Sequence, residues 1–396
     1  MNATLASAIT SYAFFFLTGF FINIGGPVSN AAAAAFGTDT AALGFCFSLF
    51  MAGRLIGILG NGALVRKRGV NRNVHVRALG LAAFFAAAGI ILLARGVNGF
   101  AAWIFLAGIA IGGMYSASNM ILVDIFEGSR RAFHVSMINF FYSVGAVLSP
   151  ALSGALLKLG APWYAPYVAF AAILLAWAAV TAGASFARLF GGTGAEPQSP
   201  SPSAAQSPER ITPPLLLICA AIVLVIFAEY MTTFWTPVYL REFRGEDALF
   251  SGLAVSAFWV AVLIGRFAES MLIARIRPRF YILASGAAAI IALLALPFQA
   301  SRPAILVSAF ASGALCAGLF PALFTFGASR AERLKHTFPT LMMVSAAIGS
   351  FLAMTAGSLI KRAAGVQGVM FAAPVAVALT VVTVFAVALA DAKEQK

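Results

Sequence analysis

The chain has 396 residues, of which 61% are apolar and only 10% are charged, and its mean hydropathy is +0.94. An average soluble domain is about 45–50% apolar and about 25% charged, and a soluble fold of this length cannot bury so much apolar surface. The composition therefore excludes an ordinary soluble enzyme, a disordered chain and a disulfide scaffold. It leaves a helical membrane protein with many spans. The net charge of +13 does not indicate a nucleic-acid partner, because the basic residues lie between the apolar stretches.

The apolar stretches predict an all-α membrane protein with twelve transmembrane helices, because a helix needs about 20 mostly apolar residues to cross a bilayer. In chain order the predicted spans are 7–34, 42–65, 78–95, 99–123, 133–158, 165–188, 214–240, 248–273, 280–299, 303–327, 338–361 and 366–390.

Basic residues and one polar segment organise these spans. Alternate connections carry 17 of the 26 Lys and Arg, the other connections carry 7, and Arg54 and Arg266 lie inside spans. The positive-inside rule places the richer set in the cytoplasm, together with both termini. Segment 189–212 is rich in Pro, Ser and Gly, which is typical of a flexible cytoplasmic linker. It divides the chain into a six-helix bundle over 1–188 and a second bundle over 213–396.

An internal repeat supports two pseudo-symmetric bundles. The stretch GIAIGGMY (108–115) matches GALCAGLF (313–320), since both place Gly, Gly and an aromatic residue at the same spacing. Gly53-Arg54 in the second span recurs as Gly265-Arg266 in the eighth. Repeats of this kind are common among secondary transporters.

Two six-helix halves joined by a cytoplasmic linker resemble the major facilitator superfamily. Residues 107–154 are similar to its fucose–proton symporter branch, and to TsgA-type proteins within it. The shared pattern is Asn119, an Asp-x-Phe-Glu-Gly-x-Arg sequence from Asp124 to Arg130, and an aromatic-Ser-x-Gly turn from Tyr142 to Gly145.

The resemblance implies a secondary transporter, multi-pass in the bacterial inner membrane and expected to act as a monomer. It implies a small polar solute as substrate, a sugar or a related metabolite, and H+ as coupling ion. Fucose–proton symporters carry carboxylates on their first and fourth helices, where this chain has Gly26 and Tyr115. The coupling group of this chain is therefore expected elsewhere.

Charged residues inside spans are functional candidates, because burying a charge there costs several kcal/mol. Glu229 lies near the middle of the seventh span, with no Lys or Arg within one helical turn in sequence. An apolar setting raises a carboxyl pKa, so Glu229 is our candidate for proton coupling. A structural, protonated Glu229 is the alternative. Asp124, at the cytoplasmic end of the fourth span, is a second candidate for coupling, or it caps the helix and pairs with a loop Arg.

Three further charges are predicted to gate the protein. Arg266 and Glu269 are three residues apart on the eighth span and so share one helix face. Arg54 is the pseudo-symmetric counterpart of Arg266. An ion pair that holds helices together is one interpretation, and an anionic substrate bound by Arg54 or Arg266 is the other.

Uncharged polar and aromatic residues are predicted to line a substrate site, because Asn needs hydrogen-bond partners within a membrane and aromatic rings can stack on a sugar. The predicted substrate-binding residues are Asn23, Tyr115, Asn119, Asn139, Tyr142, Tyr230, Trp235 and Trp259.

No motif indicates catalysis. The chain has no Walker loop, no Ser-His-Asp set and no His or Cys cluster with metal-ligand spacing, so neither an enzyme nor a metal or other cofactor is expected. The favoured function is a proton-coupled transporter working by alternating access. Two alternatives remain: an efflux antiporter that exports drugs or a secreted metabolite such as a siderophore, and a membrane sensor or assembly partner that transports nothing.

Overall fold

The computed structural model describes residues 3–68, 96–182, 212–273, 276–331, 334 and 338–394. All regular structure in these ranges is helical. Within them, nine helices are long and apolar enough to cross a membrane, and the bent pair formed by α1 and α2 makes a tenth span. The predicted span 78–95 and nearly all of the predicted linker lie outside the described residues.

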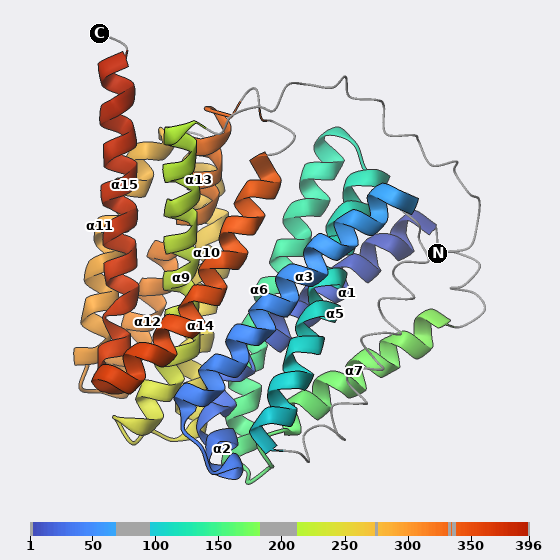
Figure 1. Ribbon diagram of the computed structural model, residues 1–396, viewed down its shortest axis with the longest axis vertical. Helices are drawn as coiled ribbons and strands as arrows, with labels where there is room; N and C mark the ends of the chain where they lie inside the picture. The colour runs from blue at the N-terminus through green and yellow to red at the C-terminus, as the bar shows by residue number, and fades with distance from the viewer. Residues whose placement is uncertain are drawn as a thin grey trace. The chain divides into compact units, whose positions relative to one another are not determined.

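The chain divides into two compact units. The first comprises Met1–Thr38 and Leu49–Gln206. Its described helices, in the cooler colours of Figure 1, are α1 (Ala3–Ile22), α2 (Gly25–Phe36), α3 (Thr40–Arg68) from Leu49 onward, α5 (Gly96–Ile125), α6 (Gly128–Lys158) and α7 (Ala165–Ala182). Helices α1 and α6 pack closely against each other in this unit.

The second unit comprises Asp39–Ser48, which are the first turns of α3, and Ser207–Lys396. Its other helices are α9 (Pro213–Glu242), α10 (Ala248–Ile273), α11 (Pro278–Ala295), the short η1 (Leu296–Phe298), α12 (Arg302–Cys316), α13 (Leu319–Ala328), α14 (Phe338–Met370) and α15 (Ala372–Glu394). Helix α9 packs against α14 and α15, and α10 packs against α12.

Glycine allows helices to pack backbone to backbone in the first unit. A Cβ atom at Gly53 or Gly57 of α3 would overlap a carbonyl oxygen of α5, and one at Gly108 or Gly112 of α5 would overlap a carbonyl oxygen of α3. Glycines on both helices therefore let the two backbones meet, as is common in membrane helix pairs. Between α1 and α6, Gly145 plays the same part.

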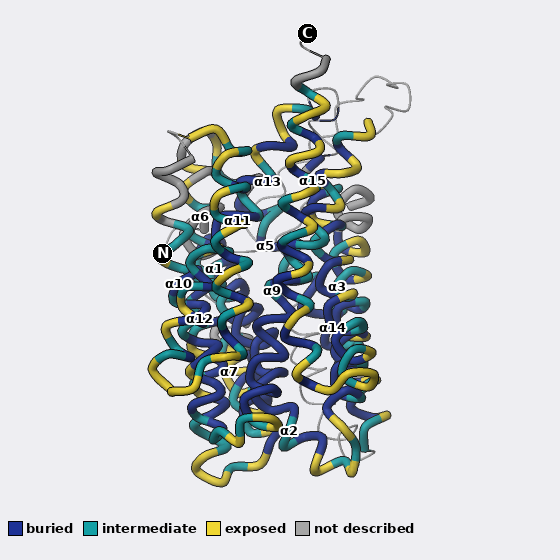
Figure 2. Tube along the Cα trace, turned by 90° about the vertical axis from the view of Figure 1, so that its left-hand side faces the viewer, coloured by how far each residue is buried: buried dark blue, intermediate teal, exposed yellow. Residues whose placement is uncertain are grey.

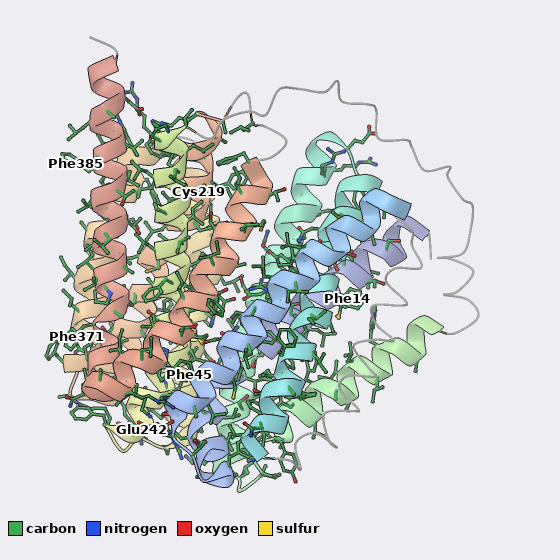
Figure 3. All side chains as sticks on the ribbon, in the orientation of Figure 1. Phe14, Phe45, Cys219, Glu242, Phe371 and Phe385 are labelled. Atoms are coloured by element: carbon green, nitrogen blue, oxygen red, sulfur yellow. The ribbon has the colours of Figure 1, made fainter. Side chains whose placement is uncertain are left out.

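Burial follows the pattern expected of a protein surrounded by lipid. Figure 2 shows buried and exposed residues alternating along many of the helices. The exposed residues include many large apolar ones, such as Ile291, Val307 and Val382. In Figure 3, Phe371 and Phe385 point away from the other helices of the second unit. Acyl chains can cover such side chains at no cost.

Several predicted spans prove to be interrupted. The span predicted at 7–34 is the α1–α2 pair, which is bent by 46°. The bend follows Asn23. The main-chain carbonyl of Asn23 cannot form the usual helical hydrogen bond four residues on, because Pro27 has no N–H. The span predicted at 303–327 divides into α12 and α13 before Pro321. Gly365, with φ of 73° and non-helical dihedral angles, interrupts α14, so the structure has a break where the sequence predicts one, between 361 and 366. A second break follows Met370, and α15 begins at Ala372. Pro150 and Pro237, in contrast, lie inside unbroken helices.

Candidate functional site

In the first unit, Arg54 and Tyr115 form a cation–π pair. The Arg54 guanidinium lies 5.0 Å from the centroid of the Tyr115 ring, and the Phe15 ring lies 4.7 Å from the same ring. Gly112, one turn before Tyr115, allows this approach because a side chain there would overlap the backbone of Arg54. Both residues are half-buried. The Tyr115 ring is thus in contact with protein groups and supports Arg54.

The predicted asparagines of the first unit bond locally. The amide nitrogen of Asn23 donates to the Gly19 carbonyl at 2.8 Å, and that of Asn119 donates to the Tyr115 carbonyl at 3.1 Å. Asn23 is buried, Asn119 is half-buried and Asn139 is exposed. These bonds satisfy amide donors within a single helix, as a membrane environment requires.

Two of the predicted tyrosines pack against the same apolar cluster, which consists of Ala8, Phe15, Leu122 and Ile138. Tyr115 reaches the cluster from α5, and Tyr142 reaches it from α6. The structure therefore brings these two predicted tyrosines to one region of the first unit, although they are 27 positions apart in the sequence.

Two polar contacts of the first unit were not anticipated. Asn61 of α3 is buried, and its amide donates to the Ser116 hydroxyl of α5 at 3.1 Å. Tyr12 of α1 and His134 of α6 are hydrogen-bonded through the Tyr12 hydroxyl and Nδ1, and the His134 ring stacks on Phe126 at 3.6 Å. The sequence could have indicated Asn61, because it is a polar residue within an apolar run. No sequence spacing indicates that Tyr12 and His134 are in contact.

In the second unit, Glu229 lies half-buried on α9. Its main-chain carbonyl accepts a hydrogen bond of 2.9 Å from the Thr233 hydroxyl, and it interacts electrostatically with Cys316 of α12. Directly after Glu229, every residue of α9 from Tyr230 to Leu240 is buried, and most of these residues are apolar.

The predicted aromatic residues of the second unit are buried. Trp235 is completely buried, and its indole fits against Gly357 of α14 and Gly44 of α3, where any side chain would overlap it. Trp259 is in edge contact with Phe258, and Tyr230 is also buried. Among the described residues, the Trp235 indole N–H and the Thr236 hydroxyl have no hydrogen-bond partner. They are buried donors that a polar solute or water could satisfy.

The predicted charge pairs are described only in part. Arg266 is half-buried on α10, one residue after Gly265, which packs closely on Ala317 of α12. The side chains of Glu269 and Asp124 lie outside what the structure describes, so the predicted Arg266–Glu269 pair and the role of Asp124 stay predictions. No group of three or more His, Cys, Asp and Glu side chains able to hold a metal occurs in the described part of the chain.

Comparison with known proteins identifies the fold. Residues 8–354 match the family model of the Major Facilitator Superfamily. Proteins named TsgA from strains of Escherichia coli are 23% identical, over 92% of this chain and 90% of theirs.

Solved structures of transporters are similar to the whole chain. A mutant of the nucleoside transporter NupG has a TM-score of 0.73 and 13% identity, covering 98% of this chain and 99% of its own. A D-xylose-proton symporter has a TM-score of 0.71 and 15% identity, covering 95% and 97%. The transporter FucP in its outward conformation has a TM-score of 0.63 and 18% identity, covering 98% and 99%. At such identities the likeness shows the fold alone.

Proposed function

The chain belongs to the Major Facilitator Superfamily and is a multi-pass membrane transporter rather than an enzyme, and on this premise we propose that it is a proton-coupled secondary transporter of a small polar solute. The two units alternate access to a central site. The solute is a sugar or a related metabolite, with nucleosides included because of the likeness to NupG. The protein acts as a monomer in the bacterial inner membrane, with both termini in the cytoplasm.

Glu229 is the observation that carries the proton coupling. It is a half-buried carboxylate in the middle of a candidate span, and the fully buried stretch of α9 from Tyr230 to Leu240 follows it directly. Membranes exclude charged groups unless function retains them. A carboxylate that is charged in one state of the cycle and neutral in another links proton movement to the movement of the units.

The site residues have separate roles in this proposal. Asn119, Asn139 and Tyr142 bind solute hydroxyl groups from the first unit, and Asn23 supports them from the bend after α1. The buried donors at Trp235 and Thr236, with Tyr230 and Trp259, contribute from the second unit. Arg54, held by Tyr115, and Arg266, with Glu269, act in gating. Asp124 serves as a second proton-coupling or gating group.

The test begins with binding. The purified protein is screened for thermal stabilisation by L-fucose, D-xylose and a nucleoside, since a ligand that binds the folded state raises the melting temperature. Uptake of the stabilising solute into proteoliposomes is then measured with and without an inward pH gradient. The pH gradient is expected to drive accumulation, and flux in the opposite sense would indicate an exporter instead.

The Glu229→Gln variant separates coupling from binding. It keeps the shape of the side chain but cannot release a proton, so we expect solute binding and solute exchange to persist while gradient-driven accumulation falls to the background. Glu246→Gln is the matched control, because Glu246 pairs with Arg302 at a helix end. Undiminished accumulation by Glu229→Gln would show that another group carries the proton.

A further inference from the structure

Two buried serines of α6 have hydroxyl groups with no hydrogen-bond partner. Ser149 and Ser153 are completely buried, and neither hydroxyl oxygen has a partner within the described part of the chain. Other buried serines of the protein bond to the carbonyl four residues back, as Ser29 and Ser312 do. Because an unsatisfied polar group is costly in a protein interior, these hydroxyls call for a bound partner such as water or an ion.

The two serines continue the side of α6 that packs on α1. Tyr142, Gly145, Ser149 and Ser153 are three or four residues apart in the sequence, so they follow one side of the helix. A Cβ atom at Gly145 would overlap a carbonyl oxygen of α1, and the backbone of Tyr142 meets Gly19 of α1. The serine hydroxyls are therefore on the side of α6 that faces α1 and the helix after it.

The order of the contacts places these hydroxyls beside the break between α1 and α2. Tyr12 bonds to His134, and the backbone of Phe20 meets Gly145, so α1 and α6 run in the same direction. Helix α1 ends two residues after Phe20, and α2 also packs against α6. The serines lie one and two turns beyond Gly145. They are therefore level with the break and with the start of α2.

Two main-chain carbonyl oxygens near the serines are released from helical hydrogen bonding. The Ile24 N–H bonds to the Phe21 carbonyl at 3.3 Å, three residues back, instead of to the Phe20 carbonyl. In α6, Pro150 has no N–H to offer to the Ala146 carbonyl, and Ala146 is completely buried. Helical carbonyls point toward the C-terminal end of their helix, so both oxygens are directed toward the level of the serine hydroxyls.

We propose that these four oxygen atoms, the hydroxyls of Ser149 and Ser153 and the carbonyls of Phe20 and Ala146, bind a sodium ion. Oxygen atoms are the ligands of hard cations, and interrupted membrane helices coordinate Na+ through carbonyls that are free of the helix. Helices α1, α2 and α6 contain no acidic residue, which suits a monovalent rather than a divalent ion. The backbones of α1 and α6 meet at Gly145, one turn away, so the space between them suits Na+ better than the larger K+.

The corresponding place in the second unit has neither the hydroxyls nor the break. Gly349 of α14 contacts the α9 backbone as Gly145 contacts that of α1, but Ala353 and Gly357 stand four and eight residues later instead of serines. Helix α9 continues there without interruption through Pro237. In the described part of the repeat, the two hydroxyls and the break thus occur together in the first unit, as expected if they serve one site.

The test measures Na+ binding to the purified protein without solute or a proton gradient, so its outcome is independent of the proposed transport function. The melting temperature is compared in NaCl and in KCl at the same pH and ionic strength, because an ion that binds the folded state raises it. We expect a higher melting temperature in NaCl, and a difference that grows with the Na+ concentration. Equal melting temperatures in the two salts would overturn the proposal.

The variants Ser149→Ala and Ser153→Ala locate the ion. Each removes one ligand, so the Na+ concentration that gives half of the shift should rise about tenfold. In KCl each variant should be at least as stable as the parent, because the lost hydroxyl makes no hydrogen bond within the described part of the protein. Ser350→Ala is the matched control, since it removes a buried hydroxyl that bonds within α14. It should leave the response to Na+ unchanged.

Glu229→Gln separates this site from the proposed proton site, and it should keep the full response to Na+. If the two serine variants respond to Na+ as the parent does, the hydroxyls hold water or only pack, and the sodium site is refuted. The same conclusion follows if Ser149→Ala and Ser153→Ala lower the melting temperature equally in both salts.

Discussion

Tyr115 illustrates how a single side chain can be read in two ways. It lies on α5 at a position where a transporter could contact solute. Its ring also contacts two protein groups, the Arg54 guanidinium and the Phe15 ring. An arginine inside a membrane needs such support, because the ring quadrupole attracts the cation where water is scarce. Positioning Arg54 is therefore the first role of this ring.

Substitution at Tyr115 tests that role. Tyr115→Phe keeps the ring and should leave the melting temperature nearly unchanged. Tyr115→Leu removes the cation–π contact and should lower the free energy of unfolding by about 1 kcal/mol more. The measurement is thermal unfolding of the purified protein in detergent. Equal losses in the two variants would mean that the hydroxyl, and not the ring, makes the important contact.

His134 gives a prediction about pH. It lies before the candidate span that starts at Met137, and its pKa lies below the ordinary value because burial disfavours the charged ring and, secondly, because Arg130 repels it. A lowered pKa means that the folded protein binds this proton more weakly than the unfolded chain. The stability from neutral His134 is therefore complete above the unfolded pKa and is lost as the pH falls through the lower, folded value.

The His134→Asn variant should consequently depend less on pH. Its melting temperature is compared with that of the parent from about pH 8 to about pH 5, across the range where histidine titrates. We expect the parent to lose more stability than the variant toward acid pH. His75 and His336 are present in both proteins, so their contributions cancel. Parallel curves would show that His134 does not titrate differently in the folded state.

The sequence could find candidate residues but not their orientation. Glu229 stood out because a carboxylate in an apolar run is rare, and the structure places it half-buried in α9. Tyr230, Trp235 and Trp259 were predicted to bind solute, and they lie within the packed interior of the second unit. Membrane helices are apolar on every side, so periodicity does not reveal which side faces other helices. The binding role of these three residues stays a prediction.

At the level of helices, glycine positions on α3 provide a matched pair. A Cβ atom at Gly57 would overlap the Ile109 carbonyl of α5, whereas one at Gly60, a single turn later, would meet nothing within 4 Å. Gly57→Ala should destabilise the protein by about 1–3 kcal/mol through overpacking. Gly60→Ala should be neutral or stabilise by up to about 1 kcal/mol, because Ala favours helix.

The same thermal measurement in detergent compares the two variants. A tolerated Gly57→Ala would mean that α3 and α5 can separate without loss, contrary to the close backbone contact. A destabilising Gly60→Ala would show that this face of α3 contacts a part of the protein outside the described residues.

Hydropathy predicted where helices lie better than where they break. The long helices α9 and α10 begin and end within a few residues of their predicted bounds. The breaks in α1–α2 and α12–α13 do not show in hydropathy, because a window average does not register one or two non-helical residues. The presence of a proline does not by itself determine whether a helix is interrupted. Pro150 and Pro237 lie in unbroken helices, whereas breaks precede Pro27 and Pro321.

At the scale of the molecule, the distribution of positive charge predicts the orientation in the membrane. A protease site placed within 189–212 should be cut in inverted membrane vesicles and protected in intact spheroplasts. A tag at the C-terminus should behave in the same way. Cleavage from the outside would reverse the whole topology.

The bend after Asn23 has a consequence for what surrounds it. Hydrocarbon offers no partner to a main-chain oxygen, so an interrupted helix survives in a bilayer only where protein or water shelters it. Asn23 and Ile24 are accordingly buried. A photoreactive probe dissolved among the acyl chains should therefore mark the apolar outer sides of α11 and α15 and leave the stretch from Asn23 to Gly25 untouched.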